Sequence, residues 1–111
     1  MNIYIIGSFH IEEGVNDLLS KIPINLENVS KEDIDKQILR AGIIAELDAV
    51  NLYEQMANLT GDADIKAILL DIAKEEKTHI GEFQALLLRL DPQQGLELEA
   101  GAEEVEEELS R

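Results

Sequence analysis

The stretch that decides the fold runs from residue 65 to residue 90 and reads IKAILLDIAKEEKTHIGEFQALLLRL. Its apolar residues recur at alternating spacings of four and three, which is typical of the inward-facing stripe of a packed α-helix. The whole stripe is Ile65, Leu69, Ile72, Glu76, His79, Phe83, Leu86 and Leu90. An acid and an imidazole therefore stand in the middle of a stripe that should be buried.

An earlier stretch carries a stripe of the same form. Its members are Leu39, Ile43, Glu46, Val50, Tyr53 and Ala57. Here too a carboxylate, that of Glu46, takes the place of an apolar side chain. Burying an ionised carboxylate is costly unless a cation or a hydrogen-bonding partner compensates it. A bound metal is the simplest explanation of both interrupted stripes.

The residues that bound the two stripes predict two helices joined by a short turn. Ser30, followed by acids, is a suitable N-terminal cap, and the helical periodicity then continues to about Leu59. Gly61 suits a left-handed residue that ends one helix, and Asp62 suits the cap of the next. Pro92 ends the second helix. Helices of similar length with so short a connection must pack antiparallel.

These boundaries predict an all-α chain of three parts. Residues 30–91 form the helical hairpin, and residues 92–111 form an acidic C-terminal segment that is either a short docked helix or a mobile tail. Residues 1–29 form an N-terminal extension of uncertain structure, with a short strand or apolar arm at 3–6 and a short helix at 11–21. His10 lies in this extension without ligand spacing around it, so it is taken as an ordinary residue.

Each long helix also has a second apolar face, which a single hairpin cannot cover. The residues on these second faces are Ile34, Ile38, Leu52, Met56 and Leu59 on the first helix and Ile68, Ala73, Ile80 and Leu87 on the second. Two hairpins cover both faces if a dimer builds a four-helix bundle, and a leftover face favours higher assembly. In the alternative, residues 1–29 and the C-terminal segment fold back over the second face.

The composition of the 111 residues limits the kinds of partner and metal site that the chain can have. A formal net charge of -15 argues against nucleic acid and anionic membrane surfaces, because both require a basic face. The chain has no Cys, which excludes disulfides, thiolate metal sites and an iron–sulfur centre within it. No stretch approaches the length of a membrane span, and the first residues do not resemble a signal peptide. A cytoplasmic protein is therefore expected.

The acid and imidazole positions match each other across the predicted hairpin. Glu76 and His79 are three residues apart and project from one side of a helix, while Glu46 precedes Gly61 by 15 residues and Glu76 follows it by 15. A two-fold dimer would bring together four carboxylates and two imidazoles, which is the ligand set of ferritin-like di-iron bundles. Four carboxylates balance the charge of two divalent ions. Iron suits these ligands, and manganese or zinc can occupy the same ones.

Other interpretations of the same residues remain open. A Glu-x-x-His pair alone occurs by chance on many acidic helices, and Glu46 and Glu76 could instead lie at the helix edge and pair with Lys or Arg. Tyr53, seven residues after Glu46, hydrogen-bonds a ligand carboxylate, or is a redox-active residue beside the ligands, or is a core tyrosine with a satisfied hydroxyl.

Residues 41–55, AGIIAELDAVNLYEQ, and residues 74–79, KEEKTH, resemble the encapsulated ferritins, two-helix ferritin-like proteins carried inside encapsulin nanocompartments. The chain is most similar to the ferritin-like part of archaeal encapsulin systems, and the likeness extends over residues 31–108. It includes the ending Leu90-Asp91-Pro92 and the tail Glu103-Glu104-Val105.

The resemblance implies a ferroxidase centre that forms only at a dimer interface, in a ring-shaped decamer of five dimers. The family ligands fall on Glu46, Glu76 and His79, and the family tyrosine falls on Tyr53. The family oxidises ferrous iron with dioxygen, and the encapsulin shell stores the product. Other members carry an acidic pair that helps iron to reach the site, and here one of these two positions is Ala45 and only Asp48 is acidic.

The same resemblance leaves the attachment to a shell open. The end Leu109-Ser110-Arg111 does not match a cargo-loading peptide, so the chain is expected to be part of a shell fusion or to be loaded differently. Two alternative functions compete with a ferroxidase. One is a non-enzymatic helical adaptor in which a metal such as zinc only holds a dimer together. The other is a rubrerythrin-like peroxide reductase, which the lack of Cys disfavours because the chain has no built-in electron donor.

Overall fold

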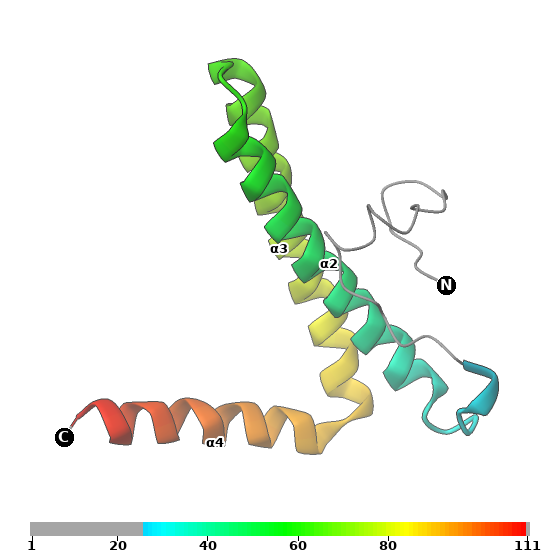
Figure 1. The fold of residues 1–111 in the computed structure, drawn as a ribbon. Helices are drawn as coiled ribbons and strands as arrows, with labels where there is room; N and C mark the ends of the chain where they lie inside the picture. The colour runs from blue at the N-terminus through cyan, green and yellow to red at the C-terminus, as the bar shows by residue number, and fades with distance from the viewer. Residues whose placement is uncertain (1–25, 111) are drawn as a thin grey trace.

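The computed structural model describes residues 26–110, which form one short 3-10 helix and three α-helices (Figure 1). The elements are η1 (Leu26–Asn28), α2 (Ile34–Leu59), α3 (Ala63–Leu90) and α4 (Pro92–Leu109). Helices α2 and α3 run antiparallel as a hairpin, and α4 leaves the open end of the hairpin to one side. The all-α prediction is confirmed. The strand or arm predicted at 3–6 and the helix predicted at 11–21 lie outside the described residues.

Helix α2 begins later than the sequence predicted. The carbonyl of Ser30 accepts hydrogen bonds from the N–H groups of Asp33 and Ile34, both at 3.1 Å, and closes a turn ahead of the helix. The Ser30 hydroxyl donates to a carboxylate oxygen of Asp33 at 3.0 Å. Asp33, and not Ser30, is therefore the residue that precedes the first helical turn. The prediction failed because this turn uses the same Ser–acid pattern as a cap.

The position of the turn between α2 and α3 was predicted correctly, but only part of its conformation was. One carboxylate oxygen of Asp62 accepts hydrogen bonds from the N–H groups of Asp64 at 2.8 Å and Ile65 at 3.0 Å, so Asp62 caps α3 as expected. Gly61 does not adopt the left-handed conformation. Thr60 is already extended, with φ -73° and ψ 140°, so the chain leaves α2 without a left-handed residue.

Small residues hold α2 and α3 together. Ala45, Ala49, Ala57 and Ala73 are among the few buried apolar side chains of residues 26–110. Their size lets the two helices approach closely, and the larger Leu87 is buried with them. The prediction that Ala73 and Leu87 belong to a second, outward face is therefore wrong, because both lie inside a single hairpin.

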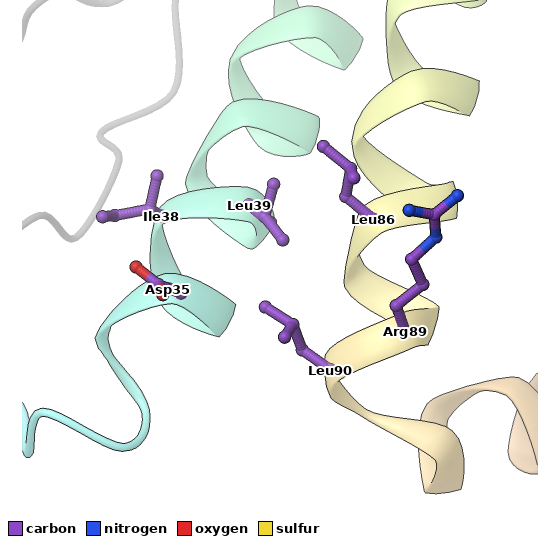
Figure 2. Close-up of a pocket in the computed structure, with 6 residues that line it drawn as sticks. All are labelled: Asp35, Ile38, Leu39, Leu86, Arg89 and Leu90. Carbon is purple, nitrogen blue, oxygen red and sulfur yellow. The ribbon is translucent and has the colours of Figure 1, made fainter.

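Several larger side chains of the predicted inward stripe remain accessible in the single chain. Ile65 is 51% exposed, Leu86 47% and Leu90 45%. Leu86 and Leu90 line a pocket of about 270 Å³ at the open end of the hairpin, opposite Ile38 and Leu39 of α2 (Figure 2). Asp35 and Arg89 complete its wall. The hairpin by itself therefore does not bury the stripe that defines it.

Gly42 is a helical glycine whose replacement tests the close packing of the hairpin. A Cβ atom added there would lie 3.1 Å from two ring atoms of Phe83, whereas one added at Gly81 of α3 meets nothing within 4 Å. Alanine is favoured over glycine in a helix by about 1 kcal/mol, but crowding in a packed contact costs about 1–3 kcal/mol. Gly81→Ala is therefore expected to stabilise the protein, and Gly42→Ala to be less stable than Gly81→Ala by at least about 1 kcal/mol.

Urea unfolding at one fixed chain concentration measures both variants, because association shifts the apparent stability. Equal stabilisation by the two substitutions would show that the Phe83 ring moves aside at no cost.

Candidate metal centre

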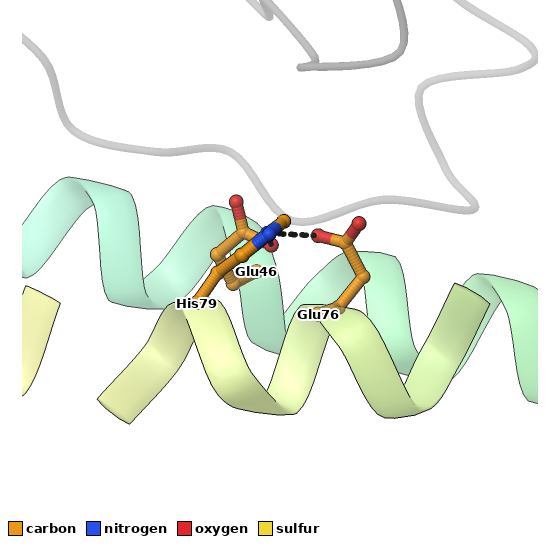
Figure 3. Close-up of side chains that lie close together, drawn as sticks. All are labelled: Glu46, Glu76 and His79. Carbon is orange, nitrogen blue, oxygen red and sulfur yellow. Dashed lines mark ion pairs between the residues drawn. The ribbon is translucent and has the colours of Figure 1, made fainter. Parts of the chain in front are cut away.

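Three side chains that can bind a metal converge half-way along the hairpin. Glu46 comes from α2, and Glu76 and His79 come from adjacent turns of α3 (Figure 3). The Nδ1 atom of His79 lies 3.4 Å from a carboxylate oxygen of Glu46 and 3.6 Å from one of Glu76. One potential ligand atom from each residue lies within 4.8 Å of the other two. Glu46 and Glu76, which are 30 residues apart in sequence, thus contribute to one site from two different helices.

The three side chains differ strongly in burial. Glu46 is only 5% exposed and is the one charged residue among those buried in the described part of the chain. The side chain of Glu76 is 16% exposed and that of His79 is 47% exposed. The cluster is therefore sealed on the side of α2 and accessible on the side of His79.

One oxygen of this cluster lacks a conventional partner. The Oε2 atom of Glu46 is buried and accepts no hydrogen bond from any described residue. A buried carboxylate oxygen without a hydrogen bond is expensive and rare in folded proteins. The oxygen faces the imidazole of His79 and the carboxylate of Glu76, so the space it points into is bounded by metal-ligand atoms.

The geometry and the donor types fit a metal ion. Ligand atoms that share one first-row ion at about 2.0–2.2 Å are separated from each other by roughly 3–4 Å, and the two distances to His79 Nδ1 fall in this range. Two carboxylates and one imidazole suit iron, manganese or zinc. Three protein donors leave coordination positions open for a further ligand.

The structure does not support the alternative interpretation of Glu46 and Glu76. In that interpretation, both residues sit at a helix edge and pair with Lys or Arg. Within residues 26–110 neither carboxylate forms an ion pair with a Lys or Arg side chain. The Lys next to Glu76 in sequence, Lys77, instead approaches Glu54 at 3.9 Å. Both carboxylates are directed at His79.

The remaining predicted residues do not join the cluster. Tyr53 lies two helical turns beyond Glu46, about 10 Å along α2, is half-buried, and has no hydrogen bond to another described residue. Ala45, where relatives are expected to carry an acid, is 3% exposed and belongs to the contact between the helices. Asp48 is half-buried on α2. Among residues 26–110, the structure thus brings together Glu46, Glu76 and His79 as the group of potential metal ligands.

Sequence inspection missed the contact that supports the cluster on one side. The ring of Phe83 lies against Gly42, and these residues are four positions from His79 and Glu46 respectively. One helical turn away from the ligands, the ring and the glycine thus set how closely α2 and α3 approach. A glycine in the middle of a strongly periodic helix was the available signal, because it costs stability unless close packing requires it.

Among the described helices, none is long and apolar enough to cross a membrane.

Comparisons with known proteins agree on one group. The family model described as EncFtn-like matches residues 22–100. A ferritin-like–encapsulin shell fusion protein of Pyrococcus furiosus is 60% identical over 78 residues, which are 70% of this chain and 22% of that protein. The encapsulin nanocompartment cargo protein EncC of Myxococcus xanthus is 46% identical over 56 residues, which are 50% of this chain and 43% of that protein. The chain thus spans less than half the length of either relative.

A solved structure is similar over most of the chain. The crystal structure of the encapsulated ferritin domain from Pyrococcus furiosus superposes with a TM-score of 0.69 at 53% sequence identity. The similarity covers 80% of this chain and 91% of that domain.

Proposed function

Since the chain belongs to the EncFtn-like family of encapsulated ferritins, we propose that it is a ferroxidase whose di-iron site is shared between two chains. Iron is the substrate: two Fe(II) ions each lose one electron to dioxygen and leave as Fe(III). The observation that carries the proposal is the convergence of Glu46, Glu76 and His79 around a buried oxygen of Glu46 that has no hydrogen-bond partner among the described residues.

The three residues have distinct roles in this proposal. Glu46 or Glu76 bridges the two ions, because a carboxylate offers two oxygens, and His79 binds one ion terminally. Anionic oxygen ligands stabilise the ferric product more than the ferrous substrate, which favours oxidation. The apolar residues along both stripes restrict access of water and limit side reactions.

The spacing of residues on α3 supports a two-fold axis at the cluster. Ile65 precedes Glu76 by 11 residues and Leu90 follows His79 by 11, while Leu69 and Leu86 lie 7 residues out on the same two sides. A two-fold axis through the cluster would place the pocket of one chain opposite Ile65 and Leu69 of the other. The half-exposed pocket of Figure 2 would then be filled and the open side of His79 covered. We refer to the side of the hairpin that carries Glu46, Glu76, His79 and the pocket of Figure 2 as the metal face.

We further propose that the chain works inside an encapsulin nanocompartment, which takes up the oxidised iron. This part is supported by the relatives, one of which is described as an encapsulin shell fusion protein and the other as an encapsulin cargo protein. The hairpin of residues 30–91 would act as the ferritin-like unit, and a ring of five such dimers would require a second interface besides the metal face.

Iron stoichiometry is the direct test of the shared site. Native mass spectrometry of the protein, before and after anaerobic addition of Fe(II), is expected to show two irons for every pair of chains and an increased dimer population. A single chain supplies too few ligands for two ions, so the irons should appear only on even-numbered assemblies. Iron-free monomers after the addition would contradict the proposal.

Admitting dioxygen to the same sample then tests the chemistry. Consumption of dioxygen with appearance of Fe(III) is the expected result. A metal-dependent dimer that consumes no dioxygen would indicate a metal-held adaptor, and reaction with hydrogen peroxide alone would indicate a peroxide reductase.

A further inference from the structure

The ring of Phe83 in α3 packs tightly against α2 at Gly42. A Cβ atom added at Gly42 would lie 3.1 Å from the Cε2 and Cζ atoms of the ring and 3.2 Å from its Cδ2 atom. Carbon atoms in ordinary contact are about 3.5–4.0 Å apart. The ring therefore fills the space that any other residue at position 42 would need. We call the packing of Phe83 on Gly42 the ring contact.

The ring contact lies one helical turn from the metal ligands. Gly42 is four residues before Glu46 in α2, and Phe83 is four residues after the ligand of α3 that faces it, His79. Long helical side chains lean toward the N-terminus of their helix, which for Phe83 is the direction of His79. The residue counts agree with this direction, since Gly42 precedes Gly61 by 19 residues and Phe83 follows it by 22. The ring thus reaches back toward the ligands to meet Gly42.

The opposite flank of the ligands is closely packed as well. Ala49 follows Glu46 by three residues in α2. Ala73 precedes Glu76 by three, and both alanines are 12 residues from Gly61, so they lie at the same height of the hairpin. They are 7% and 2% exposed, as expected where two helices approach closely through small side chains. The ligands thus lie between two tight contacts, one made by alanines and the other by the ring contact.

No described hydrogen bond orients the imidazole of His79. Its Nδ1 atom approaches the carboxylates of Glu46 and Glu76 at 3.4 and 3.6 Å (Figure 3). Among residues 26–110 it has no other polar partner. Metal-binding histidines are usually oriented by a hydrogen bond from their second ring nitrogen to a carboxylate or a carbonyl. Within the described chain, the position of the imidazole relative to Glu46 therefore depends on how α2 and α3 are spaced.

Metal binding makes this spacing critical. Metal–ligand distances in a well-formed site stay within about 0.2 Å of their ideal values. Glu46 belongs to α2, whereas Glu76 and His79 belong to α3, so a change in the separation of the helices acts directly on the ligand distances. Glu46 is only 5% exposed, and its side chain is too confined to compensate by changing its rotamer.

We propose that Phe83 is a positioning residue of the metal centre. Its ring, seated on Gly42, sets the separation of Glu46 from His79 and thereby the affinity and the geometry of the site. The proposal rests on the metal-binding role proposed above for the three ligands, but it does not depend on dioxygen as the oxidant. It explains why a glycine, which weakens a helix, stands within α2 and against an aromatic side chain.

Gly42→Ala disturbs the ring contact by a single methyl group. The ring or the helix has to move by about 0.4 Å or more to restore an ordinary carbon–carbon distance, which is roughly twice the tolerance of a metal–ligand bond. We expect Co(II) binding to weaken on the order of 10-fold or more, as it does when a group that orients a ligand is lost. Gly81→Ala is the matched control, because a Cβ atom added there meets nothing within 4 Å.

Titration with Co(II), followed by its visible absorption, measures affinity and coordination geometry together. The full chain is used at a concentration where sedimentation shows the same assembly for all variants. The wild type and Gly81→Ala are expected to give the same binding curve and the same spectrum at saturation. Gly42→Ala should bind more weakly and give a different spectrum at saturation, which a loss of stability alone would not produce.

A compensating substitution tests whether position 42 acts through the ring. Phe83→Leu removes the Cε2 and Cζ atoms that crowd an added Cβ atom, so it makes room for Gly42→Ala. Phe83→Leu alone should also weaken Co(II) binding, because the space above Gly42 is then unfilled. The double variant is expected to bind Co(II) about 3-fold or more tightly than Gly42→Ala, since substitutions in contact are not additive. Losses that simply add would overturn the proposal.

The positioning role and the proposed function can fail separately. A Gly42→Ala protein that is less stable in urea than Gly81→Ala, but keeps the Co(II) affinity and spectrum of the wild type, would show that the ring contact only holds the helices together. A wild type that binds no Co(II) would remove the metal centre and the positioning role with it. Weakened Co(II) binding by Gly42→Ala, in a protein that binds Fe(II) without consuming dioxygen, would support the positioning role and remove the ferroxidase.

Discussion

Replacing His79 by alanine is expected to slow Fe(II)-dependent dioxygen consumption on the order of 100-fold or more, and Glu76→Ala should do the same. Loss of a residue that only orients a metal ligand already costs about 10- to 100-fold, and these residues supply ligand atoms themselves. With either one missing, each chain retains two of the three groups that converge within 4.8 Å. An oxygen electrode under excess Fe(II) measures the initial rate.

Both variants should remain folded, which separates a functional from a structural effect. The side chain of His79 is 47% exposed and that of Glu76 is 16% exposed, and alanine is the strongest helix former. Glu75→Ala and Thr78→Ala are the matched controls, because they alter exposed neighbours of the ligands on the same helix. If the ligand variants oxidised iron as fast as these controls, the cluster would not be the site of oxidation.

Glu46→Met is expected to stabilise the metal-free protein by about 1–3 kcal/mol, the cost of a buried polar group without a hydrogen bond. Glu46 is 5% exposed and its Oε2 atom has no hydrogen-bond partner among the described residues. Methionine has a similar shape and no charge to desolvate, and its flexible side chain adapts to the space. The same substitution should abolish stabilisation by metal, because binding to the folded state raises stability only where a site exists.

Thermal unfolding with and without Zn(II) or anaerobic Fe(II) measures both effects. The wild type should be less stable than Glu46→Met without metal and should gain stability when metal is added. Glu54→Met is the control on the same helix, because Glu54 is half-exposed and pairs weakly with Lys77. A metal-free Glu46→Met protein that is less stable than the wild type would show that the carboxylate has a compensating partner.

Together, these two results would show that the metal-binding site destabilises the folded protein until a metal ion binds there. The hairpin contact consists mainly of alanines, and few large side chains are buried in the single chain. The metal ions and the second chain would then contribute much of the stability of the working protein. Such dependence is common in small domains, which bury a modest fraction of their surface on folding.

Much of the candidate site could be predicted because its signals are local. Glu76 and His79 share a side of α3 by their spacing, and the count of residues to the turn placed Glu46 at the same height. The cap at Asp62 and the end of α3 before Pro92 also followed from side-chain chemistry within a few residues. Ser30 and Gly61 show the limit of this approach, since the same local patterns occur in a turn and in an extended connection.

The sequence by itself determined α2 and α3, their antiparallel order and the three side chains that meet between them, because periodicity, capping and spacing act over a few turns. The sequence also placed the buried Val50 and Ala57 correctly, but only the tertiary structure decided that Ala45, Ala49, Ala73 and Leu87 are buried while Ile65, Leu86 and Leu90 are about half exposed. It also decided the course of α4, which depends on an ion pair between Arg40 and Asp91, 51 residues apart. The set of buried residues depends on how closely two helices approach, and the course of α4 depends on where distant charges meet. Helical periodicity encodes neither of these.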